Sequence, residues 1–156
     1  MNMQFENSCC GREWKRFIDR NSKAMFQTAL LLAANPRGAE AALITSMDEL
    51  DISRRPETHD LPIWEETVVK LSVGTPEMLS TEGDGSLACS LLQPGLRPVI
   101  QLDRLPRICF VLQLLLGYTT EACAAVLGVK ESEVLVLVAE AATKLPQTIA
   151  TVANCR

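Results

Sequence analysis

The chain has 156 residues, a formal net charge of −4 and 47% apolar residues, of which few are aromatic. This length is enough for one domain with a sizeable core, or for two small helical lobes. The apolar residues are mainly Ala, Leu and Val, which favours an all-α fold over a sheet sandwich. The sequence has no run of about 18 apolar residues, and its N-terminal residues lack the apolar core of a signal peptide. We therefore expect a cytoplasmic protein without a membrane partner.

Charge is divided unevenly along the chain. Residues 1–56 and 97–156 each have a net charge of +1, whereas residues 57–96 carry one base and seven acids, for a net charge of −6. A free-standing nucleic-acid binder normally concentrates basic residues on one lobe. The strongest basic cluster lies near the N-terminus, and we interpret it as the solvated side of a helix rather than as a partner site. It consists of Arg12, Lys15, Arg16, Arg20 and Lys23.

Three helices are predicted in the first half of the chain. The first covers residues 12–34 and stops at Asn35-Pro36, because Asn35 suits the N-cap of the next helix and Pro36 suits its first turn. The second runs to about Leu50, before a polar connector. The third covers residues 61–73 and has an apolar side that Trp64 should anchor in the core. This side is formed by Ile63, Trp64, Val68 and Leu71.

Shorter elements are predicted in the second half of the chain. Thr75-Pro76 can begin a short helix, and residues 81–85 suit a mobile loop. Residues 86–92 form a further predicted helix, which Pro94-Gly95 should end. Four more helices follow, and Pro146 is expected to kink or end the last of them. These four cover residues 97–103, 107–116, 119–127 and 131–149.

Residues 119–145 carry the most specific pattern, that of two helices crossing at a tight turn. Ala124 is small enough for a second helix to pass over it, Gly128 can take the positive φ that ends the first helix, and Val134 returns to the shared core. This spacing predicts a helix-turn-helix with its turn at residues 128–130. Such a unit usually places its second helix in the DNA major groove.

The run that contains this unit resembles region 4, the promoter-binding domain of bacterial extracytoplasmic-function sigma factors. The matching features are the Leu105-Pro106 pair, the apolar helix from Ile108 to Leu116, and Gly117-Tyr118-Thr119 before the helix-turn-helix. Residues 26–50 are similar, more weakly, to the start of sigma region 2 through the Ala39-Glu40 pair. The resemblance implies transcription regulation, with the RNA polymerase core and promoter DNA as partners.

The resemblance also divides the chain into three parts. An incomplete region 2-like lobe covers residues 12–80, a connector with a short helix covers residues 81–96, and a region 4-like helix-turn-helix lobe covers residues 97–150. By resemblance, the first lobe contacts the RNA polymerase core. The resemblance also implies which residues read promoter DNA. They lie at the N-terminus of the second helix of the helix-turn-helix: Lys130, Glu131 and Ser132.

Both surfaces with which sigma factors contact DNA depart here from the family pattern. The second helix has three acids and no base over residues 131–142, although contacts from Lys and Arg to phosphate supply most of the affinity for DNA. The acidic residues 57–96 hold a single aromatic residue, Trp64. They therefore lack the basic, aromatic-rich stretch that captures unpaired bases. We expect weak, salt-sensitive and poorly specific DNA binding.

The sides of the second helix suggest a protein contact instead. Its inward stripe is formed by Val134, Leu137, Val138, Ala141 and Leu145. Its sides, where a recognition helix would expose polar readers, carry what we call the apolar flank: Leu135, Val136, Ala139 and Ala142.

Three interpretations follow from this helix. The first is a sigma-factor-like transcription regulator with weakened DNA binding. The second is a sigma-derived module that no longer binds DNA and uses the apolar flank to dimerise or to bind another protein. The third is a plain helical core, in which another part of the same chain covers the flank.

No residue pattern predicts a catalytic, metal or cofactor site, and we expect a non-enzymatic protein without a cofactor. His59, the only histidine, stands in a polar connector and belongs to no recognisable triad. The Gly-rich residues 82–86 lack the lysine and the spacing of a phosphate-binding loop. The six cysteines have no zinc-site spacing. Cys109 and Cys123 suit the apolar core, and Cys9-Cys10 suit a mobile tail.

Overall fold

The computed structural model describes residues 9–74 and 84–154, and the side chains of these residues except 84–86 and 147–154. Every regular element in the described ranges is a helix, and they contain no β-strand. This confirms the all-α fold. No helix of the described ranges is both long enough and apolar enough to cross a membrane.

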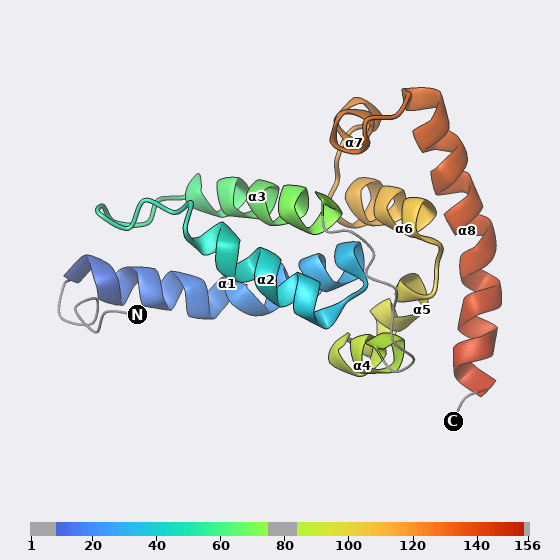
Figure 1. Ribbon diagram of the computed structural model, residues 1–156, viewed down its shortest axis with the longest axis horizontal. Helices are drawn as coiled ribbons and strands as arrows, with labels where there is room; N and C mark the ends of the chain where they lie inside the picture. Colours follow the sequence, from blue (N-terminus) through green and yellow to red (C-terminus); the bar gives the residue numbers. More distant parts are fainter. Residues whose placement is uncertain (1–8, 75–83, 155–156) are drawn as a thin grey trace.

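The helices form two groups, and the last helix, α8, stands at the right-hand edge of the molecule (Figure 1). The first group lies side by side and consists of α1 (Cys9–Ala33), α2 (Pro36–Met47) and α3 (Asp60–Gly74). The second group leads to α8, which stands at the end of the molecule opposite the N-terminus. Its elements are α4 (Asp84–Leu91), η2 (Pro94–Leu96), α5 (Arg97–Ile100), α6 (Arg104–Phe110), the π-helical η3 (Val111–Leu115), α7 (Thr120–Leu127) and α8 (Glu131–Asn154).

The corner between α1 and α2 forms as predicted. Ala34 leaves α1 with a positive φ of 53°. The Asn35 side chain then accepts hydrogen bonds from the N–H groups of Arg37, at 3.0 Å, and Gly38, at 3.3 Å. Pro36 occupies the first turn of α2, where its missing N–H costs nothing. Local capping chemistry therefore fixes this corner.

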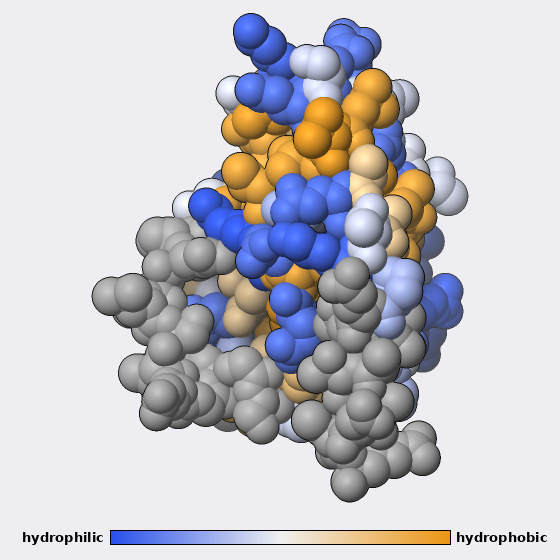
Figure 2. Space-filling model, turned by 90° about the vertical axis from the view of Figure 1, so that its right-hand side faces the viewer, coloured by the Kyte–Doolittle hydropathy of each residue, from blue (hydrophilic) through white to orange (hydrophobic). Residues whose placement is uncertain are grey.

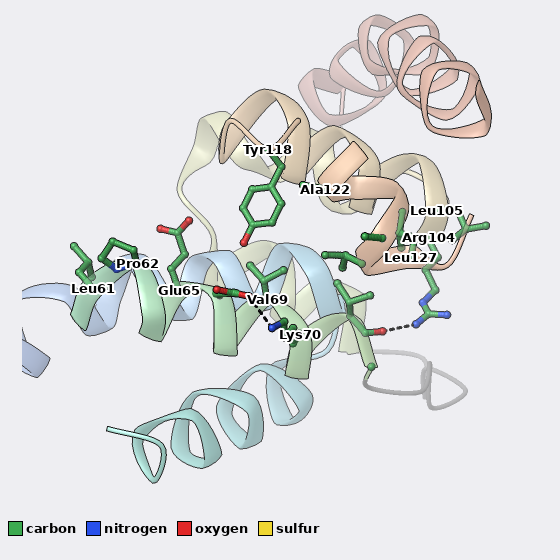
Figure 3. Close-up of a pocket in the computed structure, with 15 residues that line it drawn as sticks. Leu61, Pro62, Glu65, Val69, Lys70, Arg104, Leu105, Tyr118, Ala122 and Leu127 are labelled. Carbon is green, nitrogen blue, oxygen red and sulfur yellow. Dashed lines mark hydrogen bonds and ion pairs between the residues drawn. The ribbon is translucent and has the colours of Figure 1, made fainter. Parts of the chain in front are cut away.

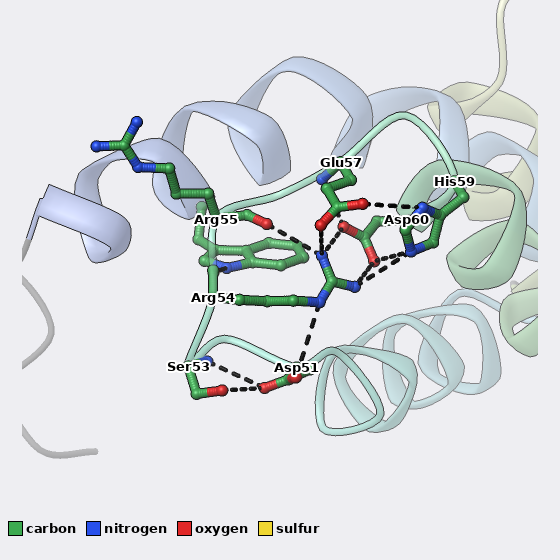
Figure 4. A network of polar contacts seen from close by, with 8 residues as sticks. Asp51, Ser53, Arg54, Arg55, Glu57, His59 and Asp60 are labelled. Carbon is green, nitrogen blue, oxygen red and sulfur yellow. Dashed lines mark hydrogen bonds and ion pairs between the residues drawn. The ribbon is translucent and has the colours of Figure 1, made fainter.

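Arg54 holds the polar connector between α2 and α3 (Figure 4). Its guanidinium donates two hydrogen bonds to the buried carboxylate of Asp60, at 2.9 and 2.5 Å, and Asp60 also accepts from the N–H of Glu57 at 2.6 Å. The Arg54 hydrogen bonds hold the pKa of Asp60 below its usual value. The Arg54 carbonyl accepts from Trp14 Nε1 at 2.6 Å, which ties the connector to α1.

One hydrophobic core joins the two predicted lobes. Its cluster of buried side chains draws on both helix groups rather than forming one cluster in each. Fully buried members include Leu30 from α1, Trp64 from α3, Ile108 from α6 and Val134 from α8. The surfaces of α3, α6 and α8 therefore have fixed positions relative to one another.

A buried arginine fastens α6 to α1. The Arg107 side chain is 3% exposed, and its Nε donates to the Leu31 carbonyl at 2.9 Å while Nη1 donates to the Leu102 carbonyl at 3.0 Å. These bonds satisfy two carbonyl groups inside the protein, where an unpaired acceptor would be costly. Arg107 is thus an internal tie and does not reach a surface where it could bind phosphate.

Two predictions about segment ends are wrong. Cys9 and Cys10 belong to the first turn of α1 instead of a mobile tail, and Asp84 and Gly85 begin α4 instead of ending a loop. At both places the helix begins a few residues earlier than predicted. Neither short segment contains a proline that would prevent the first turn from forming there. The helix predicted at Thr75-Pro76 and the rest of the predicted loop lie outside the described residues.

One prediction about a single side chain is also wrong. Ile63 is 48% exposed, because α3 turns its Trp64 and Val68 side towards α1 and α2. Pro146, expected to kink or end its helix, does not end α8, which continues to Asn154, and the kink stays a prediction. Proline removes one hydrogen bond to the carbonyl four residues earlier, but Pro146 is exposed, so water can satisfy that carbonyl.

Candidate interaction surface on helix α8

The turn between α7 and α8 forms at residues 128–130, as predicted. The Thr119 side chain caps the first turn of α7 by accepting a backbone hydrogen bond at 3.1 Å. At the other end Gly128 takes a φ of 67°, and the Val129 N–H donates to the Ala124 carbonyl at 3.1 Å. This left-handed closure is the conformation that favours glycine. It sets the direction in which α8 departs.

The three residues predicted to read DNA gather at the exposed start of α8. Lys130, Glu131 and Ser132 are all exposed. The carboxylate of Glu133 turns back over this helix end, where it accepts a hydrogen bond from the Lys130 N–H at 2.9 Å. A negative charge therefore occupies the helix N-terminus, which in a recognition helix is a favourable place for phosphate.

The inward stripe of α8 packs as predicted. Val134 and Ala141 are fully buried, and three partly buried side chains pack against the same core. These three are Leu137, Val138 and Leu145. The stripe contacts α5, α6 and α7, so the rotation of α8 about its own axis is fixed.

The apolar flank faces solvent. Leu135 is 58% exposed and Val136 is 66% exposed, and Ala139 and Ala142 are exposed as well. Figure 2 looks directly at this side of the molecule and shows a broad apolar area over its upper part, with polar groups above and below. Within the described residues nothing covers the flank, which is not what the interpretation as a plain intramolecular core predicts.

Lys144, the one base in the sequence of α8, is held by two carboxylates. Its Nζ donates to Asp103 at 2.6 Å and to Glu140 at 2.7 Å. The hydrogen bonds raise the pKa of Lys144 above its usual range, and the hydrogen bond from Lys144 lowers the pKa of Asp103. The charge of Lys144 is therefore offset locally, and the described surface of α8 presents little positive charge to a polyanion.

Other candidate groups are arranged for structure rather than chemistry. His59 is exposed, with its Nδ1 3.3 Å from Glu57 Oε2, and it lies beside the Arg54 network. Cys109 and Cys123 are fully buried, as predicted, and burial raises the pKa of Cys109 to about 11. Both thiols are therefore protonated at neutral pH. No group of three or more metal-binding side chains gathers within the described residues.

Two features of this surface were missed by sequence reasoning. The first is the Glu133 cap, which the three-residue spacing from Lys130 could have revealed, since that is the spacing of a capping box. The second is the link from Lys144 to Asp103, which are 41 positions apart. No local signal predicts that contact, because it depends on how α8 packs across the segment before α6.

Comparisons of the chain with protein-family models, with curated proteins and with solved structures found no match in any of the three. The resemblance to sigma factors therefore rests on the sequence motifs.

Proposed function

We propose that the protein is a sigma-factor-like interaction module of transcription regulation, which binds a second copy of itself through the apolar flank of α8. The observation that carries this proposal is the exposure of Leu135 and Val136 on a helix with an acidic start. Removing apolar surface from water is favourable by about 25 cal/mol per Å². A DNA groove lined by phosphates would remove little apolar surface from water. The apolar flank of a second copy would remove apolar surface on both partners.

The order of side chains along α8 fits an antiparallel pair with two-fold symmetry. Ala139 lies near the centre of the flank and is small enough for two helices to pass closely, while Leu135 would face Ala142 of the second copy. The antiparallel direction also separates the acidic starts of the two helices. A parallel pair would bring Glu131 and Glu133 of both copies together, which is unfavourable.

A double substitution in the flank tests this proposal. Leu135→Glu with Val136→Lys places charge at the contact and spares the inward stripe. The matched control, Ile44→Glu with Ile63→Lys, places the same charges at two other exposed apolar positions, which are 51% and 48% exposed. Sedimentation velocity should show a dimer for the unchanged protein and the control, and a folded monomer for the flank variant. An unchanged protein that stays monomeric at high micromolar concentration would refute the proposal.

A second function, promoter binding by a sigma-factor-like regulator, is favoured by the exposed start of α8. Lys130 and Ser132 carry hydrogen-bond donors there, on a helix that follows a tight turn. Glu131 and Glu133 stand beside them, so we expect a Kd no tighter than roughly 10⁻⁴–10⁻⁶ M, the range of non-specific association. In this function the region 2-like lobe contacts the RNA polymerase core.

Fluorescence anisotropy separates the two functions. A labelled promoter-like duplex and a scrambled duplex are titrated with the protein at physiological salt. The interaction proposal expects the same weak binding for both duplexes, with affinity that falls steeply as salt rises. Sequence-selective binding at nanomolar concentration, together with capture of purified RNA polymerase core, would replace the interaction proposal with the second function.

A further inference from the structure

A second surface feature lies on the other side of α7, away from the apolar flank. It is an open groove of about 1070 Å³ between α3 and α7, closed at one end by the start of α6 (Figure 3). Its apolar walls come from Leu61, Val69 and Val73 on α3 and from Ala122, Ala125 and Val126 on α7. Ligand sites in proteins commonly measure about 300–1,000 Å³. The α3–α7 groove is therefore large enough for an organic ligand.

The groove exists because α3 has two apolar sides. Trp64 and Val68 face the core, and the line of residues four positions apart that borders the groove runs from Leu61 through Glu65 and the fully buried Val69 to Val73. Residues at this spacing lie above one another on a helix. With a rise of 1.5 Å per residue, this line is about 18 Å long. The small side chains of Ala122 and Ala125 leave the opposite wall recessed, so the groove suits an elongated molecule.

Most charged groups of the groove are already engaged. Lys70 Nζ lies 2.7 Å from Glu66 Oε1, and Arg104 Nη2 donates to the Val73 carbonyl at 2.9 Å. Glu65 differs from them. It is half-buried among the groove's apolar side chains, and no base in the described residues forms an ion pair with it. Among the described residues, the groove therefore presents one carboxylate without a cationic partner.

Tyr118 stands over this carboxylate. In Figure 3 its ring projects from above the groove with the hydroxyl directed towards α3, and the carboxylate of Glu65 lies beside it. Burial raises the pKa of Glu65. The pKa of Tyr118 is raised by its own burial first, and then by the nearby charges of Glu65 and Glu66. Carboxylate oxygens and a phenolic oxygen can both accept hydrogen bonds from an ammonium group.

We propose that the α3–α7 groove binds an elongated apolar molecule that carries a single amine, with the ammonium group at Glu65 and the apolar part along Val69 and Val73. An amine supplies the cation that Glu65 lacks, and its hydrogen bonds to a carboxylate are of the stronger, charge-assisted kind. An anionic ligand of the same shape would place like charges together in a partly desolvated site. This site is separate from the apolar flank, and its occupation does not depend on self-association.

The experiment uses the full chain with 3-fluorotyrosine in place of tyrosine. Tyr118 is the only tyrosine in the sequence, so the fluorine spectrum contains one resonance and that resonance reports on the groove. Three probes of equal chain length are titrated at neutral pH: nonylamine, nonanol and nonanoate. We expect a saturable shift with nonylamine, an affinity for nonanol about tenfold lower, which corresponds to about 1.4 kcal/mol, and the weakest binding for nonanoate.

Three variants assign the binding to its residues. Glu65→Gln should remove the preference for the amine over the alcohol and keep the binding of nonanol. Glu40→Gln, at an exposed position on α2, should change nothing. Ala125→Trp should fill the groove and abolish the binding of all three probes. If Glu65→Gln fails to fold, this variant still tests whether the probes bind in the groove. Equal binding of the three probes, the absence of a saturable shift, or an amine preference that survives Glu65→Gln would overturn the proposal.

Discussion

The arginines that tie elements of the fold together contrast with the two lysines at α8, Lys130 just before the helix and Lys144 within it. Arg54 and Arg107 are bonded to a buried carboxylate and to internal carbonyl groups, so their charges hold elements together. At α8, Lys130 stands among acids and Lys144 is held by two carboxylates. Arg54 and Arg107 thus act as structural ties, whereas the described surface of α8 is mainly apolar and acidic. A nucleic-acid binder has the opposite distribution.

The largest expected effect compares the two sides of α8. Val134 is fully buried, whereas its neighbour Leu135 is 58% exposed. Val134→Asp should cost more than about 4 kcal/mol and unfold the C-terminal helices, because it places an unpaired charge in the core. Leu135→Asp should change the stability of the monomer by no more than about 0.5 kcal/mol. Thermal melting followed by circular dichroism at low concentration measures both, and a Val134→Asp protein with an unchanged cooperative transition would contradict the packing of α8.

The next effect tests the internal tie between α1 and α6. Arg107→Met should lower the free energy of unfolding by about 2–4 kcal/mol, because the Leu31 and Leu102 carbonyls each lose a buried hydrogen bond. Arg12→Met, at an exposed position, is the matched control and should be close to neutral. Urea unfolding measures the difference. Equal stabilities for the two variants would mean that the buried guanidinium does not fasten the helices.

A smaller effect, which depends on pH, tests the Arg54 network. The pKa of Asp60 lies below its usual value of 3.8, so the pair contributes its full stability above that value and loses it as pH falls through the lowered pKa. Asp60→Asn should therefore cost about 1.5–3 kcal/mol at neutral pH. The cost should shrink in strong acid. Urea unfolding at several pH values, with the exposed Asp48→Asn as control, tests this. A cost that does not change with pH would show that the charge of Asp60 is unimportant.

The sequence predicted best the features that depend on neighbouring residues. The Asn35-Pro36 corner and the Gly128 turn were predicted because capping side chains and positive φ act within a few positions. The helical spacing of Leu135 and Val136 placed them on the sides of the second helix, but it left open whether another part of the chain covers them. The resemblance to sigma factors and the function proposed from it stay predictions.

Features that depend on distant residues could not be predicted in this way. Arg107 bonds to a carbonyl 76 positions away, and Gln27 bonds to a carbonyl 64 positions away. The spacing of apolar residues also predicted that Ile63 lies in the core, although it is exposed. Spacing alone does not determine which apolar side of α3 is covered by other helices. The α3–α7 groove was missed for the same reason, because its two walls come from separate parts of the chain.

Disulfide cross-linking tests the antiparallel pairing of α8 most directly. The background carries Cys9→Ser, Cys10→Ser, Cys89→Ser and Cys155→Ser, which leaves only the buried Cys109 and Cys123, so that a single accessible cysteine can be added on α8. Cysteine at position 139 lies near the two-fold axis, whereas the Cα atoms of residues at 132 lie about 20 Å apart in an antiparallel pair. A disulfide needs a Cα separation below about 7 Å.

Under mild oxidation we therefore expect Ala139→Cys to form a covalent dimer and Ser132→Cys to stay monomeric. The Leu135→Glu and Val136→Lys substitutions should abolish the cross-link at position 139. Efficient cross-linking at position 132 with none at position 139, or no cross-link at either position, would contradict the proposal that this protein acts through the apolar flank of α8.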